Sequence, residues 1–256
     1  MSERPFSQAG SALIVAHRGA SSEAPENTAA AFEAAVGAGA GAVEFDVRVT
    51  ADGEAVVIHD ATVDRTTDGV GLVRDLTLAE VQRLRIGPGG TEHVPTLGET
   101  LRLLSDRIAV DIEIKNVPGE PDFDPDRELA VELVMNALDA AAFVGDVIVS
   151  SFNPLSLATS RRLRPDVATG LLTNTDVAAG AAIRFAADQG HRWALPYLGQ
   201  LEPSAARHAR SAHGAGLLLG TWITDDPALV ANLFAAGVDA VATNDPRAVA
   251  AAVSAR

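Results

Sequence analysis

The chain has 256 residues, of which 47% are hydrophobic, and carries a formal net charge of −14. The hydrophobic fraction is ample for a packed core and excludes global disorder. The acidic balance argues against nucleic acid as the main partner, because a polyanion would be repelled. Cysteine is absent, so disulfides, thiolate metal sites and a cysteine nucleophile are excluded. The length fits one domain over residues 1–256.

The beginning of the chain bears on localisation. The first ten residues are polar overall, and the first apolar run, 12–16, is too short for the hydrophobic region of a signal peptide or for a membrane span. We therefore expect a cytoplasmic protein without a membrane span. The sequence does not indicate an oligomeric state.

Short apolar runs alternate with alanine-rich helical segments along the chain. Eight runs predict strands at 13–16, 43–47, 108–114, 147–151, 168–172, 193–197, 217–223 and 240–243. Helices are expected after them at roughly 27–38, 96–105, 127–141, 154–164, 176–189, 203–214, 226–236 and 246–254. The runs are apolar without alternation, as in parallel strands covered on both faces. Eight such units predict an α/β fold, a closed TIM (β/α)₈ barrel, with an open doubly wound sheet as the alternative.

One segment interrupts this rhythm, between the second strand and its helix. Residues 50–95 form a small insertion in the second βα loop. Its start completes a hairpin over 47–58 with Asp52-Gly53 as the turn, and a short helix is expected over 77–84. In a TIM barrel, an insertion in a βα loop lies on the catalytic face.

Carboxylates cluster where the predicted strands end. Strand periodicity places Glu44 and Asp46 on one face, and it aligns Asp111, Glu113 and Lys115 in the same way. The neighbouring residues are apolar, so these carboxylates are expected to be buried and to need partners or a metal. Glu44, Asp46 and Glu113 would repel one another unless a cation lies between them. Their oxygen ligands favour Mg²⁺ or Ca²⁺ over zinc and also fit Mn²⁺.

Two histidines and two cations accompany these carboxylates. His17 ends the first strand and His59 ends the hairpin, and imidazole transfers protons near neutral pH. Arg18 and Lys115 add positive charge beside the expected metal. A metal, two cations and two histidines predict the hydrolysis or transfer of a phosphoester.

These residues stand in a series of motifs that resembles the glycerophosphodiester phosphodiesterases of bacterial type. The resemblance covers nearly the whole chain in order, through His17-Arg18-Gly19, Pro25-Glu26-Asn27-Thr28, Glu44-Phe45-Asp46-Val47, His59-Asp60, Thr62, Arg65, Thr66-Thr67-Asp68-Gly69, Val94-Pro95-Thr96-Leu97, Glu113-Ile114-Lys115, Ser150-Ser151-Phe152 and Gly220-Thr221-Trp222. Any one motif is weak, and the ordered set is specific. The pattern departs from the family after Trp222 and at Thr243-Asn244-Asp245-Pro246, which puts the substrate rim in doubt and leaves the chemistry untouched.

The resemblance implies a barrel with a short insertion after its second strand. It also implies metal-dependent hydrolysis of glycerophosphodiesters to sn-glycerol 3-phosphate and an alcohol, in lipid and glycerol metabolism. The roles that it implies are metal ligands at Glu44, Asp46 and Glu113, an acid/base pair at His17 and His59, phosphate contacts at Arg18 and Lys115, and site-organising residues at Glu26 and Asn27. Asn27 is also expected to cap the first helix. Trp222 either lines the glycerol end of the pocket or packs in the core, and the sequence favours neither.

Two other functions are weighed. A phospholipase D acting on lysophospholipids would need an apolar rim for acyl chains, and the insertion has no aromatic residue between Asp60 and Thr91. A small soluble diester is therefore the favoured partner. A phosphodiester-binding protein without activity is disfavoured, because every expected histidine and carboxylate is present. The sequence leaves open the headgroup, the native metal, which histidine is the acid, and whether water or a glycerol hydroxyl attacks.

Overall fold

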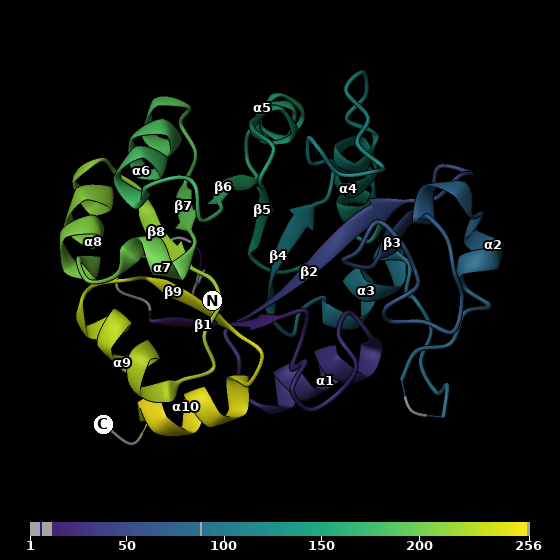
Figure 1. The fold of residues 1–256 in the computed structure, drawn as a ribbon, viewed down its shortest axis with the longest axis horizontal. Helices are drawn as coiled ribbons and strands as arrows, with labels where there is room; N and C mark the ends of the chain where they lie inside the picture. Colours follow the sequence, from purple (N-terminus) through teal and green to yellow (C-terminus); the bar gives the residue numbers. More distant parts are fainter. Residues whose placement is uncertain (1–5, 7–11, 88, 255–256) are drawn as a thin grey trace.

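Eight parallel strands close into a ring that helices surround (Figure 1). The computed structural model describes residues 6, 12–87 and 89–254, so most of the polar first ten residues lie outside the described chain. The ring follows the strands β1 Leu13–His17, β2 Ala42–Val49, β4 Ala109–Ile114, β5 Val147–Ser151, β6 Ala168–Thr173, β7 Trp193–Pro196, β8 Leu218–Thr221 and β9 Ala240–Thr243. Parallel pairs of β1 with both β2 and β9 close the ring. The closure confirms the TIM barrel and excludes the open sheet, and the predicted strand ends lie within two residues of those observed.

Helices follow the strands in the expected places. They are α1 Ala29–Gly37, α3 Leu97–Leu104, α4 Leu129–Ala140, α5 Pro154–Leu163, α6 Ala179–Asp188, α8 Ala205–Gly214, α9 Pro227–Ala235 and α10 Pro246–Ser254. The sequence analysis missed two short elements, the 3-10 helix Val73–Asp75 and α7 Leu198–Leu201. Within the described residues, none of these helices combines the length and apolar composition that crossing a bilayer requires.

The prediction that Asn27 caps α1 is wrong. The cap is Thr28, whose backbone is extended and whose side chain accepts a hydrogen bond from the Ala31 N–H. Asn27 has a φ of 57°, in the left-handed region, which an N-cap residue does not adopt. Its side chain instead reaches β2, as described below.

Two layers of apolar side chains, one outside the ring of strands and one inside it, support the rim of the barrel. The outer layer packs strand residues such as Phe45 and Ile112 against the helices. The inner layer fills the amino ends of the ring with residues such as Leu13 and Trp193. Because the strands are parallel, their carboxyl ends meet at one rim, which the inner layer leaves free for polar side chains.

Residues 50–95 form a small structure with apolar packing of their own beside β2 (Figure 1). The predicted hairpin is confirmed, since β3 Ala55–Val57 pairs antiparallel with β2. The expected helix over 77–84 is shorter, α2 Leu78–Val81, and begins with a capping box between Thr77 and Glu80. The hairpin carries His59 and Asp60 to the rim.

Candidate active site

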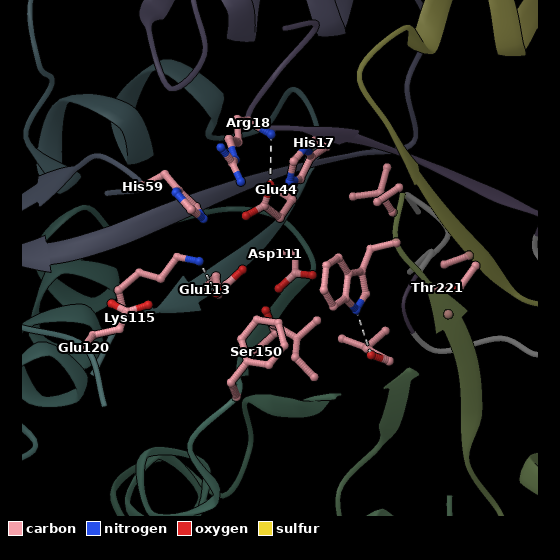
Figure 2. Close-up of a pocket in the computed structure, with 18 residues that line it drawn as sticks. His17, Arg18, Glu44, His59, Asp111, Glu113, Lys115, Glu120, Ser150 and Thr221 are labelled. Carbon is pink, nitrogen blue, oxygen red and sulfur yellow. Dashed lines mark hydrogen bonds and ion pairs between the residues drawn. The ribbon is translucent and has the colours of Figure 1, made fainter. Parts of the chain in front are cut away.

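A cavity of about 230 Å³ opens at the carboxyl ends of the strands (Figure 2). Its polar lining includes six residues singled out from the sequence, namely His17, Arg18, Glu44, His59, Glu113 and Lys115. They come from β1 and the turn after it, from β2, from the turn after β3, and from β4 and its carboxyl end. The barrel therefore assembles residues that are far apart in the sequence.

Three buried carboxylates form a tight group at this rim. Glu44, Asp46 and Glu113 each offer an oxygen, and the three oxygens lie within 4.8 Å of one another. Glu44 Oε2 accepts the Arg18 backbone N–H at 2.8 Å, whereas its Oε1 has no hydrogen-bond partner among the described residues. Burial, with the charges of Asp46 and Glu113, raises the pKa of Glu44 well above its usual value. These donors fit a hard divalent cation, which would relieve the repulsion.

Two cationic side chains lie against this group. Lys115 Nζ is 3.0 Å from Asp46 Oδ1 and also pairs with Glu113, while Arg18 Nε is 3.4 Å from Asp46 Oδ2. Burial would raise the pKa of Asp46, but Lys115, His59 and Arg18 together hold it well below its usual range. Asp46 is therefore an ionised carboxylate at the base of the site.

The two histidines have different hydrogen-bond partners. His17 Nδ1 lies 2.8 Å from the amide oxygen of Asn244, and His59 Nδ1 lies 2.6 Å from the Asp60 carboxylate. In each ring this leaves Nε2 for the cavity that both residues line (Figure 2). Burial, reinforced by the Arg18 cation, lowers the pKa of His17 to about 4. Burial also lowers the pKa of His59.

A chain of ion pairs joins the insertion to the first βα loop. Arg65 donates to both oxygens of Glu26 at 2.7 and 2.8 Å and to Asp60 Oδ2 at 2.6 Å. Glu26 also accepts from Arg18 at 2.9 Å, and Asp60 pairs with His59. Arg65 thus links the neighbourhoods of Arg18 and His59. The sequence analysis quoted Asp60 and Arg65 as parts of motifs without assigning them a role.

Asn27 and Trp222 both lie near the cavity. The Asn27 amide donates to Asp46 Oδ2 at 2.8 Å, which places Asn27 behind the carboxylate group. The Trp222 indole lines the cavity and packs edge-on against Phe152 and Tyr197, with ring centroids 5.4 and 5.3 Å away. Trp222 therefore lines the cavity and also packs against neighbouring rings, and its place at the glycerol end of a substrate stays a prediction.

Sequence reasoning named three further polar residues at this site without assigning them a role. Asp111 and Ser150 line the inner end of the cavity, and Asn244 holds His17. Burial raises the pKa of Asp111 to about 7. The signal for Asp111 was its shared strand face with Glu113, and Asn244 stood out only as a departure from the family pattern.

Comparisons with known proteins bear on what this site does. Residues 17–248 match the glycerophosphoryl diester phosphodiesterase family. The chain belongs to this family. A glycerophosphodiester phosphodiesterase of Caldanaerobacter subterraneus subsp. tengcongensis is 35% identical over 91% of this chain and 94% of its own length. One from Bacillus subtilis is 32% identical over 91% of this chain and 84% of its own. The resemblance read from the motifs is therefore confirmed, and the chain is an enzyme of the phosphodiester hydrolase class.

Solved structures agree with this family assignment. A phosphodiesterase of Oleispira antarctica, solved in complex with the product sn-glycerol-3-phosphate, is 26% identical. Its TM-score is 0.84, over 94% of this chain and 96% of that one. A glycerophosphodiester phosphodiesterase of Thermotoga maritima is 25% identical, with a TM-score of 0.76 over 95% and 98% of the two chains. The barrel is thus the fold of this family.

Proposed function

We propose that the chain hydrolyses glycerophosphodiesters to sn-glycerol 3-phosphate and an alcohol, with one divalent cation held by Glu44, Asp46 and Glu113. The observation that carries this proposal is the group of three buried carboxylates beside two histidines in one cavity. When bound, such a cation would supply Lewis-acid stabilisation of the charge on the phosphoryl oxygens. It would also make an acidic site attractive to an anion.

Arg18 and Lys115 are proposed to hold the phosphoryl group. Both line the cavity, and both are anchored by carboxylates, so their positive charges are fixed before substrate arrives. Preorganised charge of this kind stabilises a transition state at little reorganisation cost. Glu26 and Asn27 are proposed to organise the site, through Arg18 and Asp46 respectively.

The different partners of the two histidines suggest their roles in proton transfer. Asn244 is neutral and the Arg18 cation disfavours a charge on His17, so we assign His17 as the base. Burial lowers the pKa of His59, but the Asp60 carboxylate opposes this effect and favours a protonated ring more than the neutral Asn244 does at His17, so we assign His59 as the acid. His17 would take the proton of the attacking hydroxyl as the new P–O bond forms. His59 would give a proton to the leaving alcohol as the old P–O bond breaks. Water as the attacking group gives the product in this one step. If the adjacent glycerol hydroxyl attacks instead, a cyclic phosphate forms, and water then opens its ring with the two histidines in exchanged roles.

The central position of Arg65 predicts a positioning role. Arg65→Ala should lower kcat by about 10-fold or more, because Asp60 and Glu26 lose a shared partner and small displacements are costly in catalysis. The melting temperature should change little, because the Arg65 side chain is 49% exposed and exposed ion pairs add little stability. Steady-state kinetics and thermal unfolding measure the two effects.

Arg107→Ala is the matched control for that variant, since Arg107 makes a similar two-point contact with Glu33 and does not line the cavity. Addition of guanidinium should restore part of the activity of Arg65→Ala. Equal losses of kcat in the two variants would refute a positioning role for Arg65.

A second candidate function is favoured by an apolar groove of about 770 Å³ beside the cavity. The groove shares Phe152 and Trp222 with the cavity and continues along Val117, Val177 and Phe185. The sequence analysis looked for an apolar rim in the insertion, whereas this groove is formed by the loops and helix that follow β4, β5 and β6. The acyl chain of a lysophospholipid, which is carried by the glycerol that keeps the phosphate, could lie there while the headgroup alcohol leaves.

Comparison of kcat/KM for glycerophosphocholine and lysophosphatidylcholine separates these two functions. We expect the soluble diester to be preferred by about 10-fold or more, because the catalytic cavity itself is small and polar at its rim. The Phe185→Ser variant, at a side chain that is 42% exposed, should then leave glycerophosphocholine hydrolysis unchanged. A preference for lysophosphatidylcholine that Phe185→Ser weakens would instead establish the phospholipase D function.

A further inference from the structure

Asp111 and Ser150 place two buried polar groups at the inner end of the cavity. Asp111 lies two residues before Glu113 on β4, so it points into the same ring, one step nearer the amino ends of the strands. Ser150, on β5, is the register partner of Glu113. Asp111 is 8% exposed and Ser150 is 1% exposed. Apart from a contact between these two side chains, Asp111 Oδ1 and Ser150 Oγ have no hydrogen-bond partner among the described residues.

Other polar groups around this inner end are already engaged. Thr221 Oγ1 donates to the Pro196 carbonyl at 2.9 Å, and Trp222 Nε1 donates to the Leu195 carbonyl at 3.1 Å. Buried polar groups rarely stay without a partner, because an unmade hydrogen bond in the interior is costly. A carboxylate that accepts and a hydroxyl that both donates and accepts together match the hydroxyl groups of a ligand.

The remaining wall of the inner end is apolar. The Trp222 ring, fixed by its contacts with Phe152 and Tyr197, lines the cavity together with Val15 and Leu172. A small polyol has this double character, with hydroxyl groups on one side and C–H groups on the other. The glycerol moiety is also the part that all glycerophosphodiesters share, whereas the alcohol varies and requires an open path such as the groove at Phe185.

We propose that Asp111 and Ser150 bind the hydroxyl groups of the glycerol moiety and thereby make the enzyme selective for glycerol diesters. Asp111 accepts hydrogen bonds from these hydroxyls, and Ser150 forms a hydrogen bond with the hydroxyl that lies nearer to it. Figure 2 shows both side chains in the cavity below Glu44, in positions separate from Arg18 and His59. The inference rests on the proposed function, because it assumes that the phosphoryl group lies between the histidines.

Binding of two probes to the full chain in Mg²⁺-containing buffer tests this proposal. The probes are sn-glycerol 3-phosphate and inorganic phosphate, which share the phosphoryl group and differ in the glycerol hydroxyls. Isothermal titration calorimetry gives the ratio of their affinities for the wild type and for two variants, Ser150→Ala and Asp111→Asn. We expect each variant to weaken glycerol 3-phosphate binding by about 10-fold more than phosphate binding. Ser150→Ala is the decisive variant, because it alters no charge near the carboxylate group.

Ser151→Ala is the matched control. Ser151 is the next residue of β5, faces out of the ring and donates to the Ile114 carbonyl at 2.9 Å, so its loss should leave the affinity ratio at the wild-type value. Equal weakening of both probes by Ser150→Ala, or no weakening of either, would overturn the proposal. A wild type that binds both probes but cleaves no diester would refute the proposed function and not the hydroxyl contacts, which the affinity ratio still tests.

Discussion

His17→Ala and His59→Ala should each lower kcat for glycerophosphocholine by about 10²- to 10⁴-fold, the usual contribution of a positioned acid or base. Both rings line the cavity, and each has its Nδ1 held by a partner from a different loop, Asn244 or Asp60. Neither histidine is a proposed metal ligand, so both variants should retain cation binding. Steady-state kinetics at saturating cation, with calorimetric titration of the cation, measure these effects.

The leaving group distinguishes the two histidines. A nitrophenyl ester of glycerol 3-phosphate releases nitrophenolate, which can leave without receiving a proton. His59→Ala should therefore recover most of its lost activity on this substrate. His17→Ala should stay impaired, because the nucleophile still has to lose its proton. His213→Ala is the control, since His213 lies against Asp239 and does not line the cavity. Equal losses on both substrates for both active-site variants would contradict the assigned roles.

Divalent cation should raise the melting temperature of chelator-treated protein by about 5–10 °C at 100 times its dissociation constant. This range follows from about 2.7 kcal/mol of binding stabilisation and about 2–4 °C per kcal/mol for a chain of this size. The physical cause is the repulsion among Glu44, Asp46 and Glu113, which are buried within 4.8 Å of one another. Thermal unfolding with and without Mg²⁺, Ca²⁺ or Mn²⁺ gives the shift.

Glu44→Gln should remove most of the stabilisation that the cation gives. Without cation the variant should be more stable than the wild type, because a buried charge with an unpaired Oε1 is removed, and it should gain little from added cation. Glu33→Gln is the matched control, since Glu33 is an exposed partner of Arg107 and should leave the cation shift unchanged. A cation shift of equal size in both variants would place the metal elsewhere.

The barrel and the core of the site could be predicted because both depend on local patterns. The alternation of apolar runs and helices specified the strands, and the two-residue period placed Glu44 with Asp46, and Asp111 with Glu113, on inward faces. Parallel strands then bring their carboxyl ends together. Those rules are sufficient to assemble the carboxylates and histidines without knowledge of any contact.

Contacts between distant loops could not be predicted in this way. The hydrogen bond between Asn244 and His17 joins residues 227 positions apart, and that between Arg65 and Glu26 joins residues 39 positions apart. The local periodicity of the sequence therefore cannot predict them. The cap assignment failed for a related reason, because Asn27 and Thr28 are both good cap residues and only the long-range contact of Asn27 with Asp46 decides between them. The apolar groove likewise depends on which loops the closed ring brings beside Phe152.

Release of sn-glycerol 3-phosphate from glycerophosphocholine by the chelator-treated full chain tests the central claim most directly. The rate is measured before and after Mg²⁺, Ca²⁺ or Mn²⁺ is added, with Glu113→Gln in parallel. We expect no product without cation, product with at least one of the three cations, and a loss of that response in the variant. Equal rates in excess chelator and in added cation, or no product with any of the three, would contradict the claim that the carboxylate group binds a cation for phosphodiester cleavage.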